Sequence, residues 1–205
     1  MYTTSFVRRH IFMLPRGQPF TTRDLLRYGS RSAVDQALFR LVKSEVIVRL
    51  ARGVFVILDA MSRIPSVLDV AKVKAESFGK QIVCHGADAA QVLGLPVSAN
   101  RLTTYSTNGC SSSFRCGEVV VCFKRVSQRN FLLGDSRAGL LVRALWHLGQ
   151  AFCNKSLVSE AALSCTRTDR EELRQMTGLM PGWISSSFSW TRRWQAGRQP
   201  TSGWH

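Results

Sequence analysis

The chain has 205 residues, enough for one large or two small domains, and 45% of them are apolar, so most of it is expected to fold. Its 28 Lys and Arg residues against 13 Asp and Glu residues give a net charge of +15, which attracts polyanions such as nucleic acids. There is no apolar run of the ~18 residues that a membrane helix needs, and no leader with a small-residue cleavage site. We therefore expect a cytoplasmic protein with no membrane partner.

Motifs for catalysis and for metal binding are scarce in the sequence. The six cysteines contain no C-x-x-C pair, and the four histidines do not lie at zinc-site spacing from them, so we expect reduced thiols and no metal. No nucleophile elbow, P-loop or H-E-x-x-H motif is present, and no Asp-x-Asp pair occurs. Two-metal phosphoryl transfer needs clustered carboxylates. The sequence thus predicts a protein that is not an enzyme and has no cofactor.

The first 43 residues predict three helices. Residues 4–14 form the first, with Phe6, Ile11 and Leu14 as core candidates, and a proline-rich turn follows. Thr21 or Thr22 caps a second helix through Tyr28, which Gly29 ends in the left-handed conformation. Ser30 or Ser32 caps the third.

The third helix, residues 31–43, has the pattern of a recognition helix. Its apolar positions form one stripe at helical spacing: Ala33, Val34, Ala37, Leu38, Leu41 and Val42. The face left to solvent carries Arg31, Ser32, Gln36, Arg40 and Lys43. Such side chains reach base edges and phosphates from a helix in the major groove. The alternative is an ordinary amphipathic helix whose arginines only face water.

A hairpin is predicted directly after this helix. Residues 46–50 and 54–58 are rich in β-branched residues, and Ala51-Arg52-Gly53 joins them. This turn directs Arg49 and Arg52 outward, where a wing touches phosphate or the minor groove. A plain stabilising hairpin is the alternative. Helices and hairpin together predict a winged helix-turn-helix DNA-binding domain over residues 1–60.

The remaining chain predicts a second α+β region. Residues 59–65 read as a linker, and helices over 66–78, 86–93, 136–150 and 168–176 alternate with strands over 101–107, 113–115 and 119–124. Asn108-Gly109 is a strong turn signal between paired strands. The fold class is thus α+β, with the N-terminal winged helix-turn-helix followed by a mixed α/β domain over 61–184. Residues 185–205, rich in Ser, Gly and Arg, predict a basic disordered tail.

The span from Phe20 to Phe55 resembles the N-terminal winged-helix domain of the AbiEi-type antitoxins of bacterial type IV toxin–antitoxin systems. Its Gly-Ser-Arg-x-Ala-Val-Asp-Gln-Ala-Leu string and Arg-Gly-Val-Phe hairpin end carry the likeness. Weaker matches continue through His85–Leu95 and Leu179–Trp183. Two features depart from the pattern: Lys43-Ser44-Glu45 replaces a glycine-containing turn, and the chain after Ser185 has no counterpart.

The resemblance implies an autorepressor that binds its own operator as double-stranded DNA and counters a nucleotidyltransferase toxin without an obligatory stable complex. Matching positions imply that Arg31, Ser32, Gln36 and Arg40 face DNA from the helix and that Arg49 and Arg52 serve the wing. The sequence does not decide whether the protein binds DNA as a homodimer. The alternative function is a winged-helix transcription regulator whose C-terminal domain binds a ligand or partner and has no toxin partner.

Overall fold

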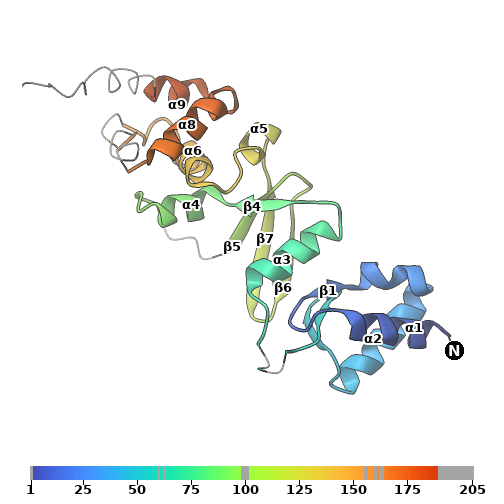
Figure 1. Cartoon of the computed structure of the whole chain (residues 1–205). Coiled ribbons are helices and arrows are strands. Elements are labelled where there is room, and N and C mark those ends of the chain that lie inside the picture. Colours follow the sequence, from blue (N-terminus) through green and yellow to red (C-terminus); the bar gives the residue numbers. More distant parts are fainter. Residues whose placement is uncertain are drawn as a thin grey trace, which may run out of the picture. The chain divides into compact units, whose positions relative to one another are not determined.

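The computed structural model describes residues 2–59, 61, 63–97, 102–154, 157–158, 161 and 164–188 (Figure 1). These residues form a mixed α+β protein with a seven-stranded sheet curled into a half-barrel. The strands are β1 (Phe20–Thr21), β2 (Val48–Ala51), β3 (Val54–Val56), β4 (Ile82–Cys84), β5 (Thr103–Thr107), β6 (Ser112–Cys116) and β7 (Val119–Arg125). The helices and 3-10 helices are α1 (Tyr2–Met13), η1 (Thr22–Tyr28), α2 (Arg31–Lys43), α3 (Val67–Glu76), α4 (Gly86–Val92), α5 (Gln128–Phe131), α6 (Arg137–Leu148), α8 (Arg167–Gln175), η2 (Met176–Leu179) and α9 (Gly182–Ser187).

The sheet has the strand order β1-β3-β2-β6-β7-β5-β4. β7 lies between β5 and β6: it pairs in parallel with β5 and antiparallel with β6. The expected pairing of strands across Asn108-Gly109 is therefore wrong, because β5 and β6 are not neighbours. Asn108 instead accepts a hydrogen bond from the Gln81 backbone N–H at 2.8 Å. The turn is thus held by the segment before β4, and β7 is the strand that pairs with β5.

Contacts divide the chain into two compact units. The first contains residues 1–82 and 102–125, and the second contains residues 83–101 and 126–205. This division does not coincide with the linker predicted at 59–65, since α3, β5, β6 and β7 pack in the same unit as the N-terminal helices. That residues 1–60 fold by themselves stays a prediction.

The N-terminal helices of the first unit enclose one core. Val7 and Ile11 of α1 pack with buried residues of η1, α2, β1, β3 and the segments before β2 and after β3, namely Phe20, Leu25, Val34, Ala37, Leu38, Leu41, Ile47, Phe55 and Ile57. Ile11 was a predicted core residue. Phe6, which was predicted with it, has 50% of its surface exposed.

The helix starts follow local hydrogen bonding. Thr21 caps η1 in a capping box with Asp24, and Ser30 caps α2 by accepting from the Ala33 backbone N–H. Ser30, and not Ser32, is therefore the cap, and α2 spans the predicted residues 31–43. Gly29 has extended backbone (φ 164°), so the left-handed conformation predicted there is wrong. It is small for another reason: a Cβ atom there would lie 2.6 Å from Thr3.

The second unit is built around α6, whose buried face packs with α8, α9 and η2. α9 runs to Ser187, and Phe188 packs against the same core, so the ordered chain continues past the predicted tail boundary at residue 185. The rest of that predicted tail, 189–205, lies outside the described residues. Within the described ranges, no helix is long and apolar enough to cross a membrane.

Candidate nucleic-acid interface

α2 presents the predicted polar face to solvent. Arg31, Ser32, Gln36, Arg40 and Lys43 are all exposed. Four positions of the predicted stripe, Val34, Ala37, Leu38 and Leu41, are buried against α1 and η1. The 3.6-residue period thus separated the two faces of this helix correctly.

Arg31 is restrained within α2. Its Nε donates to Asp35 Oδ2 at 2.9 Å, and the two side chains are 64% and 51% exposed. An ion pair this accessible to water and salt contributes little to stability. The guanidinium can therefore exchange Asp35 for a stronger anion at low cost.

The hairpin of β2 and β3 carries the other two predicted arginines. Gly53, with φ 76°, forms the turn, and both Arg49 and Arg52 are exposed. The register shifts between Arg49 and Ala51, and Arg49 Nε donates to the Ala51 carbonyl at 3.4 Å. Ala51 also pairs with Cys116 of β6, so the hairpin is anchored to the sheet along one side.

A groove of about 300 Å³ brings helix and hairpin together. Three of the seven predicted residues line it: Arg31 from α2, and Arg49 and Arg52 from the hairpin. The remaining lining comes from Thr22, Asp35, Leu38, Phe39, Val42, Gly53 and Phe55. Ser32, Gln36, Arg40 and Lys43 are not among the lining residues. The predicted set is thus divided between the groove and the outer face of α2.

Lys74 of α3 lies near Arg31, Arg49 and Arg52, although sequence analysis missed it. Its Nζ donates a hydrogen bond to the backbone carbonyl of Arg52 at the hairpin turn. Burial, and then the charges of Arg52, Arg49 and Arg31, lower the pKa of the Lys74 ammonium. The sequence did not indicate this contact because Lys74 lies 22 residues after Arg52, beyond the expected linker. We call Arg31, Arg49, Arg52 and Lys74 the basic rim.

Phe39 is a second residue that sequence analysis missed. It lines the groove, yet 68% of its surface is exposed. It is four residues from both Asp35 and Lys43 and three from Gln36, so it shares their face of the helix. Its signal in the sequence was that a large apolar residue falls outside the apolar stripe.

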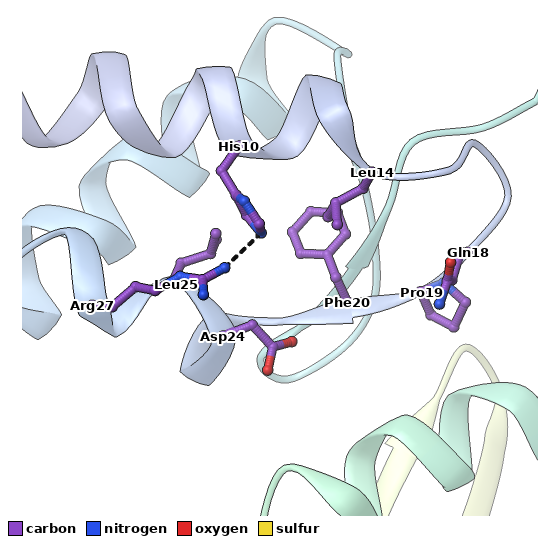
Figure 2. A pocket seen from close by; sticks show the side chains of 8 residues that line it. All are labelled: His10, Leu14, Gln18, Pro19, Phe20, Asp24, Leu25 and Arg27. Carbon is purple, nitrogen blue, oxygen red and sulfur yellow. Dashed lines mark hydrogen bonds between the residues drawn. The ribbon is translucent and has the colours of Figure 1, made fainter.

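A separate cavity of about 390 Å³ lies between α1, η1 and β1 (Figure 2). It is lined by His10, Leu14, Gln18, Pro19, Phe20, Asp24, Leu25 and Arg27. Arg27 Nη2 lies 3.3 Å from His10 Nε2, the contact drawn in the figure. Burial and the Arg27 charge lower the pKa of His10, while Asp24 acts in the opposite direction. Nε2 of a neutral His10 accepts a hydrogen bond from Arg27, and this bond stabilises the packing of η1 on α1.

The cysteines supply no activated nucleophile among the groups whose pKa shifts. Burial and the nearby carboxylates of Asp135 and Asp88 raise the pKa of Cys84 to about 11, which keeps this thiol protonated at neutral pH. Burial also raises the pKa of Cys116, Cys153 and Cys165. Among the residues that the structure describes, no three His, Cys, Asp or Glu side chains converge as a metal site.

Residues 7–171 match the model of the family of unknown function DUF6088, and the chain belongs to that family. Searches of curated proteins and of solved structures found no significant match.

Proposed function

We propose that this DUF6088 member binds duplex DNA through an N-terminal winged helix-turn-helix, and that it is the autorepressor and antitoxin of a type IV toxin–antitoxin operon. One observation carries the DNA-binding part: α2 and the adjacent hairpin direct Arg31, Arg49 and Arg52 into one exposed groove. Arginine binds phosphate with bidentate geometry, and a helix beside a hairpin is how winged domains approach DNA.

The two groups of predicted residues then have different tasks. Gln36, Arg40, Lys43 and Ser32 on the outer face of α2 lie in the major groove, where Gln and Arg recognise base edges. Arg49 and Arg52 bind phosphates beside that groove and fix the orientation of α2. The net charge of +15 adds attraction that does not depend on DNA sequence.

The antitoxin part rests on the resemblance of Phe20–Phe55 to AbiEi-type antitoxins. On this proposal, the partners are the operator of the protein's own gene and a nucleotidyltransferase toxin that is countered without a stable complex. The protein works in the cytoplasm without a cofactor or an enzymatic activity of its own, and a homodimer on DNA would match a palindromic operator.

Gel-shift titrations with the DNA upstream of the gene test the first part. We expect Arg31→Ala, Gln36→Ala and Arg40→Ala to weaken specific binding, by about 1–3 kcal/mol for a side chain that reads a base. Arg167→Ala is the matched control: it removes the same charge from α8, and its side chain is 95% exposed. If all three variants bind as tightly as the wild type, α2 is not the recognition helix.

Growth rescue tests the second part. The toxin candidate is a neighbouring reading frame with a Gly-Ser and Asp-x-Asp nucleotidyltransferase motif, expressed with and without the full chain. We expect the chain to restore growth, and Arg40→Ala to do so as well, because neutralisation does not need the operator. If the chain binds its operator but protects against no neighbouring toxin, the alternative function holds: the protein is a transcription regulator with another ligand or partner.

A further inference from the structure

The outer face of α2 combines charge with an apolar centre. Phe39 is exposed over 68% of its surface, and Lys43 and Gln36 lie within one helical turn of it. The groove beside it is lined by Arg31, Arg49 and Arg52. An exposed phenyl ring costs free energy in water, and a group of like charges adds repulsion. A partner that covers this face must therefore offer anions around an apolar contact.

Duplex DNA satisfies both demands, and a second copy of this face does not. Two copies would bring two basic rims together, which like-charge repulsion disfavours. In the major groove, phosphates flank the base edges, and the C5-methyl group of thymine is the apolar group that those edges present. A phenyl side chain is one of the groups that contacts this methyl.

We propose that Phe39 is a specificity-determining residue that reads thymine methyl groups in the operator, while the basic rim binds the adjacent phosphates. This inference rests on the proposed DNA-binding function and deepens it. Gln36 and Arg40 recognise bases by hydrogen bonding, whereas Phe39 excludes water from a methyl group. The operator half-site should therefore contain at least one thymine under the middle of α2.

The test compares thymine with deoxyuridine, which pairs identically but lacks the methyl group. Duplexes selected from random DNA by the full-length protein are resynthesised with deoxyuridine at each thymine in turn. For the wild type we expect binding to weaken roughly fourfold at the contacted position, the factor that corresponds to ~0.8 kcal/mol for one buried methyl-sized group. Phe39→Ala should bind both duplexes equally, and Phe39→Leu should keep part of the difference.

Phe12→Ala is the matched control, since it removes an exposed phenyl ring of α1, and we expect it to retain the full preference for thymine. Circular dichroism and melting curves establish that each variant is folded.

Equal binding of the wild type to every substituted duplex overturns the role of Phe39 and leaves the proposed function standing. An absence of any sequence preference overturns both. If Phe39→Ala changes the sedimentation of the free protein but not its preference for thymine, the ring contacts a second copy, and the inference is wrong.

Discussion

Arginine side chains lie in opposite surroundings in the two compact units. In the first unit, Arg31, Arg49 and Arg52 are exposed around one groove. Arg31 pairs with the exposed Asp35, and Arg49 donates to the Ala51 carbonyl at 3.4 Å, weak contacts that an anion can replace. In the second, Arg143 of α6 is only 1% exposed and donates to Asp135 Oδ1 at 3.0 Å and to the Asn130 carbonyl at 3.3 Å. Asp135 in turn accepts from the Cys84 backbone N–H. Burial, and not residue type, separates the arginines that we propose to bind DNA from the structural Arg143.

The largest effect we expect concerns Arg143, which is 1% exposed, whereas its partner Asp135 is 51% exposed. Asp135→Ala would leave the Arg143 charge buried without its carboxylate, which should lower the free energy of unfolding by roughly 3 kcal/mol. The double variant Asp135→Ala, Arg143→Met removes the buried charge as well and should recover part of that loss. Urea unfolding measures both.

The exposed pair in α2 provides the control for this comparison. Asp35→Ala removes the carboxylate that faces Arg31, and we expect a change of no more than ~0.5 kcal/mol because both side chains are solvated. Equal losses for Asp35→Ala and Asp135→Ala would show that burial does not distinguish the two arginines.

A second prediction tests how far the proposed DNA-binding region depends on the rest of its unit. A fragment of residues 1–60 lacks Val70, which packs on Ala51 and Val54, and lacks the Lys74 hydrogen bond to the hairpin turn. We expect it to melt at a lower temperature than the full chain and to bind DNA more weakly. If both values equal those of the full chain, the domain boundary predicted at 59–65 is right and the contacts from α3 contribute nothing.

The sequence predicted those features of the site that depend on residues close to one another in the chain. The length of α2, its buried stripe, and the exposure of all seven predicted site residues followed from helical period and turn chemistry. The position of Lys74 did not, because its contact with Arg52 depends on how α3 packs on the hairpin, which no spacing in the sequence encodes. The insertion of β7 between β5 and β6 was missed for the same reason: a parallel pairing joins strands that no short turn connects.

A third prediction concerns the kind of contact that the rim makes. Arg52→Ala should weaken binding to all DNA sequences alike and reduce the slope of log affinity against log salt by ~0.9, the value for one lost phosphate contact. Gln36→Ala should leave that slope unchanged and relax the preference at one base pair. Titrations over several salt concentrations separate the two. A sequence-dependent effect of Arg52→Ala would mean that the hairpin reads bases.

The smallest expected effect is a pH dependence from the cavity of Figure 2. The pKa of His10 is lowered from 6.5, first by burial and then by the Arg27 charge, so the folded state binds this proton less readily than the unfolded state. Stability should therefore be complete above pH 6.5 and decrease as the pH falls below it, levelling off below the folded pKa. His10→Gln, which cannot titrate, should flatten this part of the profile of unfolding free energy against pH, and Arg27→Gln should reduce it by removing one cause of the shift. Because His10 is partly exposed, the change should be far smaller than that for Asp135→Ala. Wild-type stability that rises on acidification through this range would contradict a neutral His10 in the folded protein.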